Sequence, residues 1–193
     1  MKDFFASLSV LIAFIGFAPY ISDVIKRKTK PHALSWLVWS ILGVIGFSIQ
    51  ITHNAGPGAW LFGVSTLITS AIFILSLKYG ERNILIVDWL SFLLAGLALF
   101  LWLIVKRPLA SVILLAFTDA IGGFFPTFRK SITKPHEETL ALYYLYAVSL
   151  ACSLVALRSF SLVNALYPAS FVVINIFMTS FLIIQRRKLS NRQ

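Results

Sequence analysis

Asp119 is the residue of this chain whose type and position most directly suggest chemistry. It lies inside a long apolar run, residues 108–128. An ionised carboxylate near the centre of a bilayer costs about 2.5–3.5 kcal/mol, so such a group normally faces protein or a water-filled cavity. There it could couple transport to a proton gradient or anchor a polar solute, although a structural hydrogen bond between helices explains it equally well. Gly122, Gly123 and Pro126 follow closely and indicate a bend.

Asn175 is a second polar group deep in an apolar run, with Thr179 and Ser180 one turn further on. Its amide needs hydrogen-bond partners, which a solute hydroxyl, carboxylate or amine could supply. A hydrogen bond between neighbouring helices, typically about 0.6 kcal/mol in membrane proteins, is the alternative. Asn175 is therefore a candidate substrate-binding residue with a structural role left open.

Two groups of aromatic residues could form a stacking pocket or an inner gate. Trp36 and Trp39 are three residues apart and share a helix face, and Tyr143, Tyr144 and Tyr146 form the second group. Tryptophans near helix ends often mark the lipid interface, and this is the simpler interpretation of Trp36 and Trp39. If both groups instead face the axis between them, Trp39 and Tyr143 are candidate walls of a substrate site.

The composition shows that these residues belong to membrane-spanning elements. Of the 193 residues, 59% are hydrophobic and only 12% are charged, against about 25% in a typical soluble domain. The mean hydropathy is +0.87. A soluble enzyme or binding module is thus excluded, and the single cysteine, Cys152, excludes an intrachain disulfide and a cysteine-rich metal site. The class is an all-α integral membrane protein.

Seven apolar segments are each close to the roughly 20 residues that a helix needs to cross a bilayer. They cover residues 4–22, 33–52, 59–79, 84–105, 108–128, 140–157 and 166–185. Because backbone polar groups in lipid must pair within the segment, we expect seven transmembrane helices.

The basic residues predict the orientation of these helices. With seven spans, thirteen Lys and Arg residues fall on the side that receives the C-terminus and four on the side of the N-terminus. Cytoplasmic segments carry the excess of Lys and Arg, so we expect the N-terminus outside and the C-terminus inside. The formal charge of +10 then reflects topology and contact with anionic lipid, and we expect no nucleic-acid partner.

A four-residue word recurs and predicts an internal repeat. Thr29-Lys30-Pro31-His32 returns 104 residues later as Thr133-Lys134-Pro135-His136. Each copy follows a helix with a proline near its inner end, Pro19 or Pro126, and precedes an aromatic-rich helix. Trp39 and Tyr143 have the same 104-residue offset. We therefore predict a first three-helix repeat in residues 1–80, a linker helix in 81–106 and a second repeat in 107–193. The odd linker makes the two repeats parallel, with a substrate site at their interface.

This pattern resembles the SWEET and PQ-loop transporters. The resemblance is carried by Ala18-Pro19-Tyr20 through Lys30, by Pro126-Thr127-Phe128-Arg129-Lys130, and by the 3+1+3 layout with the N-terminus outside. Neither copy has the Pro-Gln pair, because Tyr20 and Thr127 follow the prolines. The resemblance implies an asparagine on the third helix of each repeat. Asn175 matches in one repeat, and the other has Ser65 at about the corresponding place.

Pro19 and Pro126 each remove one helical hydrogen bond and introduce a kink. The resemblance favours hinges that gate the substrate site, and a fixed bend required for packing is the alternative. His32 and His136 lie in equivalent loops, but a zinc site needs three or four ligands, so we expect no metal. Asp88 is expected to snorkel or cap its helix.

The predicted function is a small-solute transporter or facilitator with alternating access, optional proton coupling through Asp119, and no cofactor or catalytic residues. A non-retinal seven-helix receptor or a regulatory membrane subunit is the alternative, because residues 166–185 contain no lysine for a retinal Schiff base. The expected partners are a small solute and the lipid bilayer. The chain is expected to act as a monomer or homo-oligomer in a cell (inner) membrane.

Overall fold

The computed structural model describes residues 1–81 and 85–190, apart from some side chains of the fourth helix. The side chains left out are those of Val87, Asp88, Ser91, Ala95, Ala98, Leu99 and Trp102. The prediction for Asp88 therefore lies outside the described residues.

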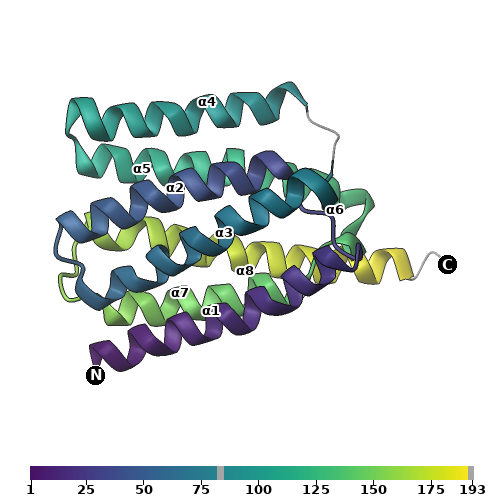
Figure 1. Cartoon of the computed structure of the whole chain (residues 1–193), viewed down its shortest axis with the longest axis horizontal. Coiled ribbons are helices and arrows are strands. Elements are labelled where there is room, and N and C mark those ends of the chain that lie inside the picture. The colour runs from purple at the N-terminus through teal and green to yellow at the C-terminus, as the bar shows by residue number, and fades with distance from the viewer. Residues whose placement is uncertain (82–84, 191–193) are drawn as a thin grey trace.

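The described chain is all helical, as the composition predicted, with eight α-helices in one bundle (Figure 1). Their bounds are α1 Lys2–Ile25, α2 Ala33–Thr52, α3 Trp60–Tyr79, α4 Ile86–Phe100, α5 Pro108–Thr118, α6 Phe125–Thr133, α7 Leu140–Ala156 and α8 Leu162–Ser190. A π-helical turn, η2 Leu101–Val105, extends α4, and another, η3 Asp119–Phe124, joins α5 to α6.

Five of the described helical stretches are long and apolar enough to cross a membrane: Lys2–Ile25, Ala33–Thr52, Gly56–Tyr79, Pro108–Thr133 and Leu162–Ser190. The predicted segments 84–105 and 140–157 are represented by shorter helices, α4 with 15 residues and α7 with 17. Helix α7 is short because the second Thr-Lys-Pro-His copy continues through a 3-10 turn, so α7 starts one turn later than α2 relative to its copy. The multi-pass membrane character is confirmed, while the count of seven spans stays a prediction.

The surface of the bundle is that of a membrane protein. Large apolar side chains are exposed along helices from both halves of the chain, such as Phe14 on α1, Leu67 on α3, Leu93 on α4 and Val173 on α8. A soluble protein rarely exposes contiguous apolar surface of this extent, whereas lipid tails cover it without cost. The bilayer is therefore the natural solvent of this surface.

The first and last parts of the chain have matching helix contacts. In the first part of the chain α3 packs against both α1 and α2, and in the last part α8 packs against both α5 and α7. Across these two sets α1 packs against α7, and α2 packs against η3. Helix α4 lies at one edge of the bundle, beside α5 and α2 (Figure 1).

Small residues bring α1 and α7 together. Ala6, Ser9, Ala13 and Gly16 are buried along one face of α1 at helical spacing. A Cβ at Gly16 would lie 3.2 Å from Leu145 Cβ, and the Ser149 hydroxyl donates to the Ser9 carbonyl at 2.6 Å. In a bilayer such close backbone approach is a main source of helix association.

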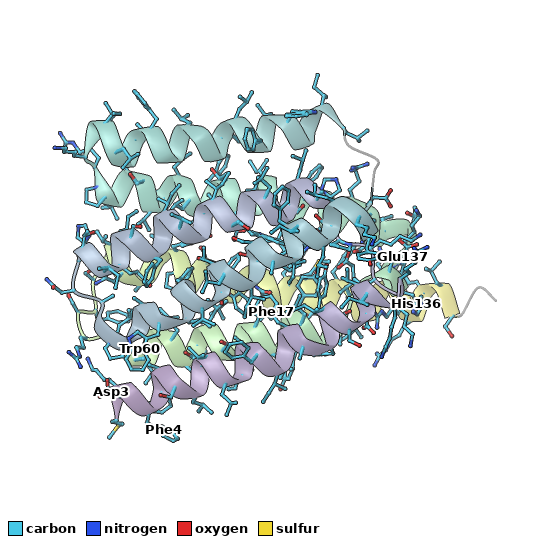
Figure 2. The ribbon with its side chains drawn as sticks, in the orientation of Figure 1. Asp3, Phe4, Phe17, Trp60, His136 and Glu137 are labelled. Carbon is cyan, nitrogen blue, oxygen red and sulfur yellow. The ribbon has the colours of Figure 1, made fainter. Side chains whose placement is uncertain are left out.

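The two chain termini lie at opposite ends of the bundle (Figure 1). We call the end with the N-terminus the N-face, which holds the loops 53–59 and 157–161. We call the other end the C-face, which holds the loops 26–32 and 134–139 with both Thr-Lys-Pro-His copies. Figure 2 shows Asp3 and Trp60 at the N-face, His136 and Glu137 at the C-face, and Phe17 between them.

Candidate functional site

An aromatic-lined cavity lies between the two helix sets. Its volume is about 40 Å³. This is room for about three water molecules, since each needs roughly 10–15 Å³. Its walls come from α1, α2, α3, η3, α7 and α8, so both sets contribute to it.

Six aromatic side chains in the wall form a closed circuit of ring contacts. In order around the circuit they are Phe17, Trp36, Trp39, Phe124, Phe171 and Tyr146. Neighbouring ring centroids are 4.8 to 6.4 Å apart, the range in which aromatic pairs attract. The interplanar angles run from 64° to 83°, so the rings meet edge to face. Tyr143 joins through Phe124, and Tyr167 joins through Phe171.

The buried position of Trp36 and Trp39 shows that the lipid-interface interpretation is wrong for both. Trp39 is 8% exposed and Trp36 donates from its indole to the Tyr20 hydroxyl at 3.2 Å. The sequence could not separate the two interpretations, because both place an aromatic near a helix end. Tyr143 is also buried in the cavity wall, whereas Tyr144 is 58% exposed on the outside of α7.

Polar groups interrupt the aromatic wall on α3 and α8. Ser65 and Asn175, predicted from the two third helices, both line the cavity. The Asn175 amide donates to the Phe171 carbonyl of its own helix at 2.8 Å, which leaves its carbonyl oxygen for a further partner. Thr66 and Thr69 add hydroxyls on the α3 side. Both of these threonines were missed from the sequence, where they look like ordinary helix-surface residues.

Asp119 is buried behind Trp39. Its Oδ1 accepts a hydrogen bond from the Trp39 indole nitrogen at 2.7 Å, and the residue is 1% exposed. Gly123 makes this pairing possible, because a Cβ there would overlap the Trp39 indole nitrogen and lie 2.8 Å from Asp119 Oδ1. The π-helical turn η3 carries both Asp119 and Gly123, and such turns often occur at functional sites. Asp119 thus reaches the cavity through Trp39 and does not itself line it.

Hydroxyl and charged groups join the two helix sets at the C-face. The Thr29 and Thr139 hydroxyl oxygens are 2.8 Å apart, and Thr139 also donates to the Asp23 carboxylate at 3.0 Å. Lys30 pairs with Glu137 at 3.3 Å. These contacts close the cavity toward the C-face.

A buried ion pair lies directly beneath this closure. Lys130 of α6 pairs with Glu138 and also donates to the Lys30 carbonyl at 2.5 Å. Glu138 in turn accepts a hydrogen bond from the Tyr143 hydroxyl at 2.8 Å. Since Tyr143 lines the cavity, one chain of contacts runs from the cavity wall to the C-face loops.

Close backbone approach closes the N-face. A Cβ at Gly58 would lie 3.0 Å from the Leu157 backbone, so only glycine fits there. The Arg158 amide donates to the Ala55 carbonyl at 2.9 Å. Lys2 caps the Leu157 carbonyl at 2.5 Å. Each of these contacts joins the α2–α3 loop or α1 to the α7–α8 loop.

The two predicted gating prolines lie beside members of the aromatic circuit. Pro19 is inside α1, two residues after Phe17, and Pro126 is in the first turn of α6, two residues after Phe124. Phe17 and Phe124 have the same position ahead of the two prolines of the predicted repeat, but neither ring was predicted as a site residue, and this match is the signal that would have found both. Each proline removes one backbone donor, which loosens the helix next to the cavity wall.

His32 has a structural role at the start of α2. His32 precedes α2 and accepts at Nδ1 from the Ser35 amide at 3.4 Å, so it caps that helix. Within the described residues, no group of three or more His, Cys, Asp or Glu side chains could hold a metal ion.

Comparisons with known proteins found no family model, curated protein or solved structure that matches the chain. Its function is therefore argued from its own geometry.

Proposed function

We propose that the chain is a small-solute transporter or facilitator of the SWEET/PQ-loop type, captured in an occluded state. The observation that carries this proposal is the aromatic cavity between the two helix sets, with contacts at both faces that cross from one set to the other. Separating the sets at one face while the other stays closed would give alternating access to the cavity. A cavity of about 40 Å³ is too small for most solutes, so a bound solute must widen it.

The helix packing supports the 3+1+3 repeat. If α1, α2 and α3 are exchanged with α5–α6, α7 and α8 in that order, each major contact among these helices becomes another. The α1–α3 contact becomes α5–α8, and α2–α3 becomes α7–α8. The α1–α7 contact becomes the contact of α2 with α5 and η3. A pseudo-twofold axis along the membrane normal has this effect, and parallel-repeat transporters bind substrate on such an axis. In this scheme α4 with η2 and α7 also cross the membrane, which gives seven spans.

In this proposal the site residues have distinct tasks. Trp39 and Tyr143 form opposing aromatic walls, Asn175 and Ser65 contact the solute through hydrogen bonds, and Asp119 acts through Trp39 as the protonatable group. The two faces differ in chemistry: contacts between charged side chains and hydroxyls hold the C-face, whereas the N-face contacts end on backbone carbonyls. Each gate can therefore be blocked on its own.

The direct test is solute flux in proteoliposomes. The full chain is reconstituted and counterflow is measured for a panel of labelled sugars, amines, amino acids and nucleosides. We expect at least one class to exchange faster than in protein-free liposomes. Equal flux for every solute in both preparations would contradict the proposal.

A cysteine lock makes this test specific to the C-face. The side chains of Thr29 and Thr139 meet across the two sets with their hydroxyl oxygens 2.8 Å apart, so the lock is placed there as a Thr29→Cys/Thr139→Cys variant that also carries Cys152→Ser. Oxidation should stop flux and reduction should restore it. The controls are the two single-cysteine variants Thr29→Cys and Thr139→Cys, each with Cys152→Ser. Because neither can form a disulfide between the sets, oxidised and reduced samples of each control should transport equally.

A further inference from the structure

The charges around the cavity are unbalanced. Among the described residues that line it, none carries a formal charge. The carboxylate of Asp119 lies directly behind the wall, and the second nearby carboxylate, Glu138, is paired with Lys130. In the ion pairs that the structure describes, Asp119 has no cationic partner. Among the described residues, Asp119 is thus the carboxyl group beside the cavity that has no cationic partner in these ion pairs.

Aromatic faces are the preferred surroundings of organic cations. A ring face carries negative electrostatic potential and attracts a cation within about 6 Å of its centroid, and Trp is the strongest of the aromatic residues. A circuit of six rings, each in contact with the next, lines this cavity, and two of the rings are tryptophans. The attraction between cation and ring is stronger where the cation is removed from water, as it would be among these rings.

Asp119 reinforces the attraction through Trp39. The indole N–H points at the carboxylate at 2.7 Å, so the donor end of the ring is already occupied. A hydrogen bond to an anion polarises the donor group in a low-dielectric site, which makes the indole ring more electron-rich. A cation against Trp39 also supplies the counter-charge that an ionised Asp119 needs at this depth.

The same wall has no positive charge for an anion. A phosphate or carboxylate is bound most strongly by Arg or Lys, and the described lining has aromatic rings, hydroxyls and the Asn175 amide instead. A zwitterionic amino acid would leave its carboxylate without a cationic partner in a largely apolar pocket, which is costly. We infer that the solute is an organic cation without a carboxylate, a substituted ammonium bound in the aromatic circuit against Trp39. This inference rests on the proposed function and names its substrate class.

The test uses three probes of nearly equal shape on the purified full chain. Choline carries a trimethylammonium head, 3,3-dimethylbutan-1-ol replaces its nitrogen by carbon and is neutral, and glycine betaine adds a carboxylate. Binding is measured by isothermal titration calorimetry, with tetraethylammonium as a larger cation. We expect choline or tetraethylammonium to bind at least about tenfold more tightly than the alcohol and the betaine.

Two variants assign the effect to the named residues. Asp119→Asn and Trp39→Phe should each reduce the preference for the cation over the alcohol, measured as the ratio of the two affinities. Trp60→Phe is the matched control, because Trp60 is half exposed at the N-face and should leave all affinities unchanged. Far-ultraviolet circular dichroism confirms that each variant is folded.

The outcomes separate this inference from the proposed function. Equal affinity for charged and neutral probes, tighter binding of the betaine, or no binding of either cation overturns the inference. If liposomes then still exchange a neutral or anionic solute, the proposed function survives alone. If choline binds but no solute crosses, the cation site survives and the proposed function fails.

Discussion

At the scale of single residues, the arrangement around Asp119 is the most demanding feature of the protein. The Trp39 indole N–H donates to the Asp119 carboxyl group, and Gly123 leaves room for this contact because it has no Cβ. Asp119 was predicted from its position in an apolar run, and Trp39 from the repeat offset. Their direct contact was not predictable, because they are 80 residues apart.

Replacing Asp119 by Asn tests its role in proton coupling. The amide keeps an oxygen that can accept from Trp39 but cannot take up or release a proton at physiological pH. We expect Asp119→Asn to lose uptake driven by an imposed pH gradient while counterflow of the same solute persists. Both rates are measured in proteoliposomes. Full dependence on the pH gradient in the variant would exclude Asp119 as the coupling group.

Replacing Gly123 by Ala tests the packing of the same cluster. The added methyl overlaps the Trp39 indole and crowds Asp119, so we expect a loss of about 1–3 kcal/mol in the free energy of unfolding. Gly96→Ala on α4 is the matched control, since a Cβ there meets no atom within 4 Å. A lower Tm for Gly123→Ala, with an unchanged or higher Tm for Gly96→Ala, is the expected result. Equal Tm values for both would show that the cluster tolerates the methyl.

At the scale of elements, two of the helical runs next to the cavity have interrupted hydrogen bonding. Pro19 breaks the ladder of α1, and η3 with Pro126 breaks the run from α5 to α6. Both breaks follow an aromatic ring of the circuit, so a change in bend moves a wall of the cavity. The bend was predicted from prolines and glycines, but a π-helical turn has no clear sequence signal.

The hinge and the fixed-bend interpretations of the prolines give different results for alanine variants. Pro19→Ala and Pro126→Ala restore a backbone donor and stiffen the helix. If the prolines are hinges, turnover falls by about tenfold while Tm stays equal or rises. Pro108→Ala is the control, because this proline begins α5 and is outside the cavity lining. Wild-type turnover in both gating variants would favour the fixed bend.

At the scale of the whole molecule, the cavity exists only between the two helix sets. Small residues hold α1 to α7, α2 contacts η3, and the loops meet at both faces. The two Thr-Lys-Pro-His copies, recognised as a repeat in the sequence, lie in the loops that meet at the C-face. The sequence predicted two equivalent loops but did not reveal that these two loops contact each other.

The buried Lys130–Glu138 pair predicts how strongly the C-face holds the sets together. Lys130→Met leaves Glu138 buried without its cation, and such losses typically cost about 3–5 kcal/mol. We expect a marked fall in Tm for Lys130→Met and for Glu138→Gln, and partial recovery in the double variant. Lys134→Met is the control, because its 3.5 Å pair with Glu81 is half exposed. Additive losses in the double variant would contradict direct coupling of the pair.

The sequence by itself determined the class of the protein, the approximate helical segments, and the individual candidates Asp119, Asn175, Trp39 and Tyr143. These follow from local chemistry, because hydrophobic length, charge and proline act within one segment. Only the tertiary structure decided that Trp39 faces inward, that Asp119 lies behind it, and that Phe17 and Phe124 complete the circuit. In a uniformly apolar helix the lipid-facing and protein-facing sides look alike, so the facing of a side chain is fixed only by the helices that pack against it.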